Sequence, residues 1–403
     1  MVYRKIAKNE PIRPVVYGIC FYFMLAGADS FQIGTIGSVL RLVALVPLAL
    51  SILDLNDFQL RFSPSMVFQL LFLFLAVISL FYSVNVSKTV TAVKTLALNL
   101  FLVFLFGVVE QYNQRELQYM QRAMLIGGWV AILLMFLFSD ISEGGRLTLL
   151  IGEAAQDPNY INGFFLYTFS WHSSKLLLEK KRLHIIPVLF IVYVLLLTGS
   201  RGALLAFLAV FFVHVCVFLR QTKHMIRNII LFVLIIVVSS VVFDLILVQL
   251  PESVSQRFSW DYISENGTTG RTSIWMFFLR LFTDSSIPRM FFGYGYGTTL
   301  YLNTAYNRVA HNLYLDDLIS VGIIGMLLQI ATQWTVFRNL VKYKEYSLLG
   351  AYCGMLCMCL SLSLVAYKPI WNIMLLSLAI DFHEKSKLHT STSPGGITQE
   401  VSL

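Results

Sequence analysis

The feature that most constrains this chain is a series of apolar runs long enough to cross a lipid bilayer. A transmembrane helix needs ~20 apolar residues, and we expect twelve such spans. Charged residues make up only 13% of the 403 residues, against about 25% in a soluble domain. The predicted fold class is therefore all-α, a polytopic integral membrane protein of about twelve transmembrane helices. The expected spans are Val15–Ala28, Gly34–Leu53, Ser65–Ser83, Val90–Glu110, Ala123–Ser139, Tyr160–Ser174, Leu183–Thr198, Gly202–Leu219, Asn228–Leu250, Leu313–Phe337, Tyr346–Ala366 and Ile370–Phe382.

One polar stretch, Pro251–Asn312, interrupts these runs. It divides the chain into nine expected helices in residues 1–250, an extracytoplasmic loop in 251–312, three helices in 313–382 and a disordered cytoplasmic tail in 383–403. A loop of this length in a compact protein is usually functional or disordered. We expect it to cover an active site on the outer face of the membrane.

The distribution of lysine and arginine predicts the orientation. With the N-terminus in the cytoplasm, 19 of these residues fall on the cytoplasmic side and ten on the outer side, as the positive-inside rule requires. The polar stretch then faces outward although it carries five arginines. We expect these arginines to serve a ligand; the alternative is that they only solvate a long loop. They are Arg257, Arg271, Arg280, Arg289 and Arg308.

Several chemistries are excluded by what the sequence lacks. All five cysteines lie in apolar runs, so neither a disulfide framework nor a zinc site is supported. No P-loop, Asp-x-Asp pair or carboxylate cage for a divalent ion is present. We therefore expect no metal and no other cofactor. The net charge of +8 follows from the cytoplasmic loops, so no nucleic-acid partner is expected.

Two arginines are the first candidates for binding an anion. Arg201 follows Ser200 in a Gly-flanked outer turn, and an arginine at membrane depth is costly and usually functional. Its fork of donors matches phosphate oxygens; the alternative is that it snorkels to the interface. Arg271 precedes Trp275 by four residues, on one face of a helix. Arg271 could hold a phosphate and Trp275 could stack on a sugar or acyl chain, although interfacial tryptophans are common without a function.

Other polar residues of the outer side, Ser200 and Asn312 among them, are candidates for binding the sugar substrate. Asp157 and Asn159 flank Pro158, which indicates a helix cap or, alternatively, a contact to a sugar hydroxyl. Tyr294 and Tyr296 lie in the glycine-rich segment Gly293–Gly297; they could stack on pyranose rings or simply belong to a turn. Arg289 of the same loop is a further candidate ligand-binding residue.

His311 and Asn312 stand where the tenth span begins. The positive end of that helix disfavours an imidazolium ion, so His311 is expected to be neutral and available as a base. The alternative is a histidine that only hydrogen-bonds a helix terminus. Asp316 and Asp317 follow at membrane depth, where an unpaired charge is costly, and we expect them to pair with outer arginines.

Together these segments resemble the bacterial O-antigen polymerase and ligase family, mainly over Leu183–Gly325. The resemblance implies an all-helical glycosyltransferase of the GT-C type that needs no metal and uses a glycan on undecaprenyl diphosphate. It also implies that Arg201 and Arg271 contact the lipid diphosphate and that His311 is essential, at the acceptor. The matching segments are Asp157-Pro158-Asn159, Ser200-Arg201-Gly202-Ala203, Gly270-Arg271 with Trp275, Phe292-Gly293-Tyr294-Gly295 and Ala310-His311-Asn312.

Two activities share these residues in the family. The favoured one is a repeat-unit polymerase for capsule, exopolysaccharide or O-antigen, with a lipid-linked acceptor; the alternative is a ligase that attaches the glycan to lipopolysaccharide core. A rival of another class is a transporter or flippase of an anionic lipid, with Arg41, Arg201 and Asp244 along its path. A non-catalytic assembly partner of an export complex is a third option. The resemblance places the protein in the bacterial cytoplasmic membrane, with flippase and chain-length regulator proteins as expected partners.

Overall fold

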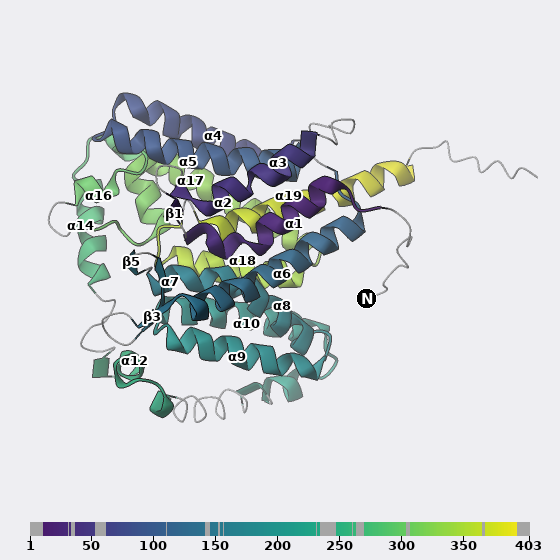
Figure 1. Ribbon diagram of the computed structural model, residues 1–403. Helices are drawn as coiled ribbons and strands as arrows, with labels where there is room; N and C mark the ends of the chain where they lie inside the picture. The colour runs from purple at the N-terminus through teal and green to yellow at the C-terminus, as the bar shows by residue number, and fades with distance from the viewer. Residues whose placement is uncertain are drawn as a thin grey trace, which may run out of the picture.

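A computed structural model describes residues 11–392, with the exception of 31, 34–36, 53–61, 110, 142–145, 152–153, 156, 231, 234–246, 260, 263–269, 304–306 and 365–366. The chain forms a bundle of helices that run in roughly one direction (Figure 1). Its strands are two to five residues long and pair as β1–β2 (Gln32–Ile33, Gly37–Ser38) and β3–β4–β5 (Ser139–Ile141, Leu147–Ile151, Ala154–Ala155), all antiparallel. The predicted all-α class is confirmed.

Five helical segments of the described chain are long and apolar enough to cross a membrane. They are α4 with η4 (Pro64–Ile78, Ser79–Phe81), α5 with η5 (Val86–Phe104, Leu105–Val109), α6 (Gln114–Leu137), α10 (Arg201–Gln221) and α17 (Leu313–Lys342). Shorter apolar helices are α1 (Pro14–Met24), α2 and α3 (Val39–Val43, Leu45–Ser51), η7 with α9 (Arg182–His184, Ile185–Leu197) and α18 (Tyr346–Cys359). The chain is thus a multi-pass membrane protein, while the count of twelve spans stays a prediction. Most of the ninth expected span, Asn228–Leu250, lies outside the described residues.

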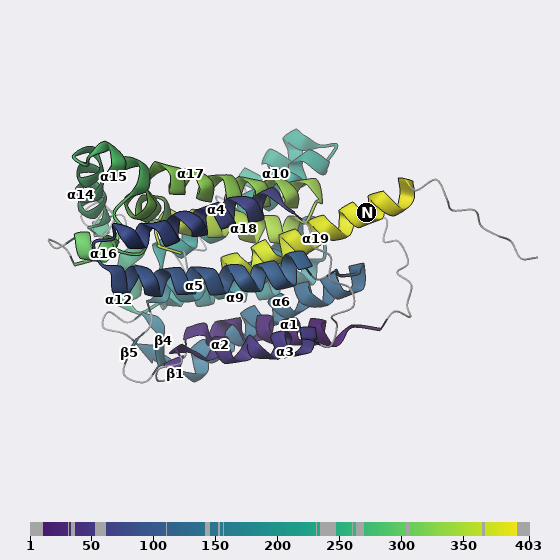
Figure 2. The same cartoon turned by 90° about the horizontal axis from the view of Figure 1, so that it is seen from above.

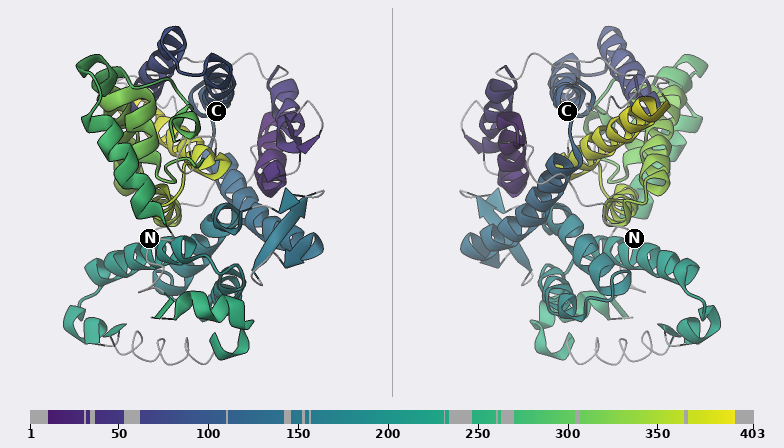
Figure 3. Two further views of the ribbon diagram at one scale, coloured as in Figure 1. Left: turned by 90° about the vertical axis from the view of Figure 1, so that its left-hand side faces the viewer. Right: turned by 90° about the vertical axis from the view of Figure 1, so that its right-hand side faces the viewer.

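Two further helical segments complete the bundle. The first is α7, η6 and α8 (Pro158–Ile161, Asn162–Phe165, Leu166–Leu177), which follow one another without a break. The second is α19 (Lys368–Thr392). It continues past Phe382 into the stretch predicted to be a disordered tail, and residues 393–403 lie outside the described chain. In the bundle α10 packs on α18, α4 on α17 and α1 on α6 (Figure 3).

The predicted outer segments gather at one end of the bundle. The polar stretch contains α12 (Glu252–Ser255), η8 (Gln256–Phe258), α14 (Arg271–Thr283), α15 (Ile287–Phe292) and α16 (Thr299–Leu302). From the side and from above, α12, α14 and α16 lie at the same end as β3 and β5 (Figures 1 and 2). Much of the expected loop is therefore helical, and its helices lie across the ends of the membrane-length ones.

Helix α17 is broken at Gly322, where φ is +72°. The break frees the carbonyls of Ile319 and Ser320, which accept hydrogen bonds from the backbone N–H groups of Tyr294 (2.9 Å) and Gly295 (3.0 Å). A Cβ at Gly322 would overlap the carbonyl group of Phe291, and a left-handed φ costs any other residue energy. The glycine-rich segment thus docks on the break, which joins the polar stretch to α17.

Candidate active site

The turn between α9 and α10 is the backbone around which the polar residues gather. Gly199 has a φ of +58°, and the carbonyls beside it point outward to two arginines. Arg146, just before β4, donates from Nε to Thr198 O (2.8 Å), and Arg257, in η8, donates from Nε to Gly199 O (3.0 Å). A Cβ at Gly199 would lie 3.3 Å from Arg257 Cδ. The turn therefore needs glycine both for its φ and for the close approach of these side chains.

A short chain of hydrogen bonds ties the start of α7 to the same turn. Asp157 Oδ1 accepts from the backbone N–H (2.8 Å) and the side-chain Nδ2 (2.6 Å) of Asn159. Ser200 Oγ then donates to Asn159 Oδ1 (2.6 Å) and caps α10 by accepting from Ala203 N (3.2 Å). The helix-cap interpretation of Asp157 is confirmed. Contact of Asp157, Asn159 or Ser200 with a sugar stays a prediction.

Four arginines act on one another at this end: Arg146 before β4, Arg201 in α10, Arg257 in η8 and Arg271 in α14. Arg201 is the first residue of α10 and its guanidinium lies 5.6 Å from the ring centroid of Tyr262; Arg271 is the first residue of α14. Burial lowers the pKa of Arg271, Asp157 opposes that shift, and Arg201 and Arg257 lower it further. Burial, followed by the charge of Arg257, lowers the pKa of Arg146 to about 10. Arginine keeps its proton in proteins, so the cluster has an excess of positive charge that a bound anion would relieve.

The loop Ala310–Asn312 is held on both sides of His311. Ala310 O accepts from the indole Nε1 of Trp275 (2.8 Å), and Ala310 N donates to Asp316 Oδ1 (3.2 Å). Asn312 caps α17 by accepting from the N–H groups of the next turn, and its Nδ2 donates to Leu360 O (3.2 Å). These bonds fix where His311 stands relative to α14, α17 and α18.

His311 itself is in a conformation that non-glycine residues rarely adopt, with φ +50°. Its Nδ1 is buried and has no hydrogen-bond partner within the described part of the chain. Burial lowers the pKa of His311, as do the charges of Arg271 and Arg308, while Asp157 opposes them. The imidazole is therefore held neutral, as expected, but by burial and nearby cations. The influence of Arg271 and Asp157 also shows that His311 lies at the arginine cluster.

The expected pairing of Asp316 and Asp317 with outer arginines is wrong for the described residues. Asp316 accepts hydrogen bonds from Ala310 N and from Ser363 Oγ. Asp317 is 1% exposed and its Oδ2 has no hydrogen-bond partner among the residues that the structure covers. Asp316 thus positions the His311 loop, and Asp317 faces a small internal cavity with Gln69 and Gln333.

The structure does not bring Arg289, Tyr294 and Tyr296 into contact with the arginine cluster. Arg289 donates to Tyr82 O (3.0 Å) and Gly293 O (3.2 Å), and its guanidinium lies 5.0 Å from the ring centroid of Tyr294. Tyr296 is 3% exposed and packs edge-on against Phe72. These side chains hold the glycine-rich segment in place, and their binding of a sugar stays a prediction.

Sequence reasoning gave no role to Arg146, and it predicted that Arg257 serves a ligand only as one of the five arginines of the polar stretch. Both were predicted to lie on the outer side against the positive-inside bias, so they carried the same indication as Arg271. No motif distinguished them from Arg280 or Arg308. Among the described residues no group of three or more His, Cys, Asp or Glu side chains comes together to bind a metal.

The fold and this site define a multi-pass membrane protein with a cationic cluster and a neutral histidine at one end. Residues 186–330 match the family described as O-Antigen ligase. This stretch of the chain is thus similar to that family, which confirms the predicted resemblance, and the match indicates a membrane enzyme of the O-antigen ligase or polymerase type. The matched range includes Arg201, Arg257, Arg271 and His311 but not Asp157. No curated protein matches the chain.

Proposed function

We propose that this protein is a polysaccharide repeat-unit polymerase of the bacterial cytoplasmic membrane. It transfers a glycan from undecaprenyl diphosphate to a lipid-linked acceptor at the outer face. The observation that carries this proposal is the cluster of Arg146, Arg201, Arg257 and Arg271 at one end of the bundle, together with His311, on which Arg271 acts. The family match supports the general class of reaction.

The positive charge of the arginines complements the negative charge that develops on the diphosphate leaving group. When the bond between the anomeric carbon and the diphosphate oxygen breaks, the electron pair goes to the diphosphate. Preorganised cations lower the energy of that developing charge in a partly buried site. Arginine donates two parallel hydrogen bonds to phosphate oxygens, so Arg201 and Arg271 would bind the diphosphate while Arg146 and Arg257 shape the turn.

His311 suits the acceptor. A neutral imidazole can accept the proton of the attacking hydroxyl as the new bond to the anomeric carbon forms. Undecaprenyl diphosphate then leaves with the electron pair, and the proton passes from His311 to solvent. A single displacement of this kind inverts the anomeric centre.

A ligase that attaches the glycan to lipopolysaccharide core is the second candidate, because the matched family is described by that activity. Both reactions would use the same arginines and histidine and would differ in the acceptor. For the transporter alternative, Arg201 belongs to the cationic cluster, while Asp244 lies outside the described residues.

Reconstitution of the purified chain with lipid-diphosphate-linked repeat units tests the proposal. A polymerase forms a ladder of products from these units alone, whereas a ligase forms product only when lipopolysaccharide core is added. Arg271→Ala and His311→Ala should each abolish product. The matched control is Arg280→Ala, since Arg280 is exposed in the last turn of the same helix. Full activity of both site variants would overturn the residue assignment, and absence of any ladder from the wild type would overturn the polymerase assignment.

A further inference from the structure

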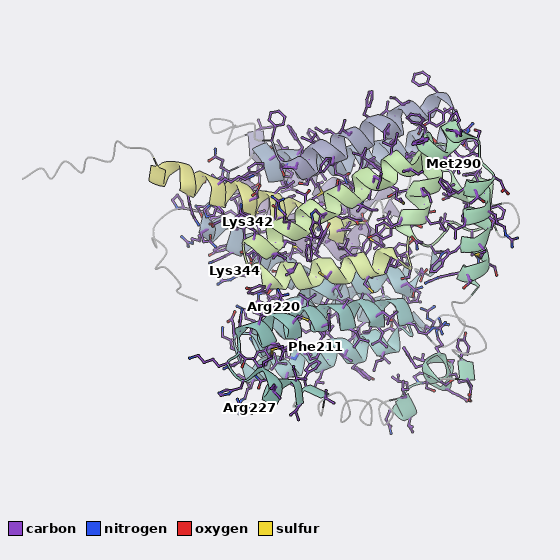
Figure 4. The ribbon with its side chains drawn as sticks, turned by 180° about the vertical axis from the view of Figure 1, so that it is seen from behind. Phe211, Arg220, Arg227, Met290, Lys342 and Lys344 are labelled. Carbon is purple, nitrogen blue, oxygen red and sulfur yellow. The ribbon has the colours of Figure 1, made fainter. Side chains whose placement is uncertain are left out.

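A second polar cavity lies at the opposite end of the bundle from the arginine cluster. It has a volume of about 690 Å³ and lies between the start of α6, the end of α8, the end of α10 and the turn from α17 to α18. In Figure 4, Arg220, Lys342 and Lys344 mark this end, and Met290 of α15 marks the other. Cavities of 300–1,000 Å³ are typical of small-ligand sites.

The cavity presents cations that the protein leaves unpaired. Arg122 and Lys344 line it, both are exposed, and neither side chain forms a hydrogen bond or ion pair with a described residue. Lys344 lies in the turn between α17 and α18 and has a φ of +58°. Two unpaired cations, one from α6 and one from the turn between α17 and α18, thus face one solvent-open space.

The carboxylates of the wall are already engaged. Glu179 forms ion pairs with Lys175 and with Lys181 (2.9 Å). Burial alone would raise the pKa of Glu179, but the hydrogen bonds from these two lysines lower it. Glu345 accepts a hydrogen bond from Gln121 Nε2 (3.2 Å), and burial raises its pKa. The charge open to a ligand is therefore positive.

Neutral polar groups and one aromatic ring complete the wall. Gln114, Gln118 and Gln121 follow one face of α6 at helical spacing, where their amides can bond to phosphate oxygens and hydroxyls. Trp171 also lines the cavity, with Lys175 Nζ 5.3 Å from its ring centroid. The cavity wall thus offers a ligand positive charge, amide hydrogen-bonding groups and one aromatic face.

We propose that this cavity binds the phosphate-bearing headgroup of an anionic phospholipid. Basic pockets between membrane helices are suited to such headgroups, and the cavity opens where α6, α8, α10 and α17 reach the end of the bundle. Arg122 and Lys344 hold the phosphate, and the glutamines of α6 bond the polar remainder of the headgroup. This site is separate from the proposed transfer reaction and does not depend on it.

Native mass spectrometry of the full chain, released from nanodiscs of phosphatidylglycerol and phosphatidylcholine in equal amounts, tests the proposal. The wild type should retain phosphatidylglycerol preferentially. Arg122→Gln combined with Lys344→Gln should weaken retention at least about tenfold, because each cation near an anionic surface contributes on the order of a factor of five in affinity. The matched control is Arg227→Gln combined with Arg338→Gln, which removes two exposed cations outside the cavity. Equal losses in the two double variants would overturn the proposal, because the attraction would then be general.

Photolabelling shows where on the protein the lipid binds. Competition with a soluble phosphate shows whether the ligand is the lipid or a free phosphate. Phosphatidylglycerol with a photoreactive headgroup should label peptides of α6 and α8 in the wild type and in the control variant, but not in the cavity variant. Labelling elsewhere would overturn the proposal. Soluble glycerol phosphate at the same concentration should not displace the lipid; if it does, the lipid assignment is wrong.

Discussion

At the residue scale, His311 owes its protonation state to its surroundings. Burial lowers its pKa first, and Arg271 and Arg308 add to that effect. A neutral base works above its pKa, so the transfer rate should fall only as the pH drops below the ordinary histidine value of 6.5. If His311 is the proposed base, we therefore expect the acid limb of the pH–rate profile to follow the pKa of His311 and to report on its neighbours.

Arg308→Gln tests this dependence. Removing one cation that lowers the pKa of His311 should move the acid limb to higher pH and leave the plateau rate unchanged. The shift should shrink in high salt, because Arg308 is exposed and exposed charges are screened. The measurement is the rate of glycan transfer from mildly acidic to neutral pH. An unmoved limb, or the same movement in Arg280→Gln, contradicts the role given to Arg308.

Trp275 positions the histidine loop through one hydrogen bond. Trp275→Phe keeps a large ring but removes the N–H that donates to Ala310 O. A single hydrogen bond contributes about 1 kcal/mol, so kcat should fall about fivefold while KM for the donor stays within about twofold. Trp334→Phe is the matched control, because Trp334 is exposed on α17 and stacks on Phe337 of the same helix. A normal kcat in Trp275→Phe would mean that this bond does not position His311.

At the element scale, the break in α17 is supported from outside the helix. Gly322 and Gly270 share a left-handed φ, +72° and +78°, yet a Cβ at Gly270 meets nothing within 4 Å. Gly270→Ala should therefore cost about 1 kcal/mol of unfolding free energy from backbone strain alone. Gly322→Ala adds overlap with the Phe291 carbonyl and should cost at least about 3 kcal/mol.

Thermal unfolding of the two variants in the same detergent measures this difference. Gly322→Ala should also lose the hydrogen bonds of Tyr294 and Gly295 to the broken helix. Equal loss of stability in the two variants would show that overlap at Phe291 does not limit position 322.

The membrane-length helices follow from the sequence, but the helices of the polar stretch and the break in α17 do not. Apolar length predicts α4, α5, α6, α10 and α17, because a bilayer requires it. Asp157 and Pro158 predict the start of α7. The run Leu313–Phe337 indicates one continuous span, since Gly322 is a tolerated residue in an apolar helix. Its left-handed φ arises from Gly293–Gly295 docking on it, a contact that no local pattern encodes.

At the scale of the whole molecule, the candidate site is an assembly of helix ends. The fold brings together, at one end of the bundle, four arginines from separate segments of the sequence: Arg146, Arg201, Arg257 and Arg271. Their gathering at one end was predictable, because charge and topology predict that all four lie on the same side of the membrane. Which outer side chains converge was not, because Arg289, Tyr294 and Tyr296 satisfy the same pattern and pack elsewhere.

The substitution Arg257→Gln tests whether the arginine cluster as a whole supports donor binding. Arg257→Gln removes both a charge near Arg271 and the hydrogen bond to Gly199 O. Loss of a charge-assisted contact costs about 1.5–3 kcal/mol, so KM for the lipid-diphosphate donor should rise at least about tenfold. Arg280→Gln should leave it unchanged. Donor titrations at fixed acceptor give the measurement, and an unchanged KM in Arg257→Gln would place Arg257 outside the donor site.

The docking of Tyr294 and Gly295 on the break also has a mechanical consequence. The part of α17 before Gly322, which begins beside His311, is hydrogen-bonded to the polar stretch at the point where the helix's own backbone hydrogen bonds are interrupted. We therefore expect this part to move with the polar stretch and not with the part of α17 after Gly322. Substitutions that repack the second part should then leave the His311 loop in place.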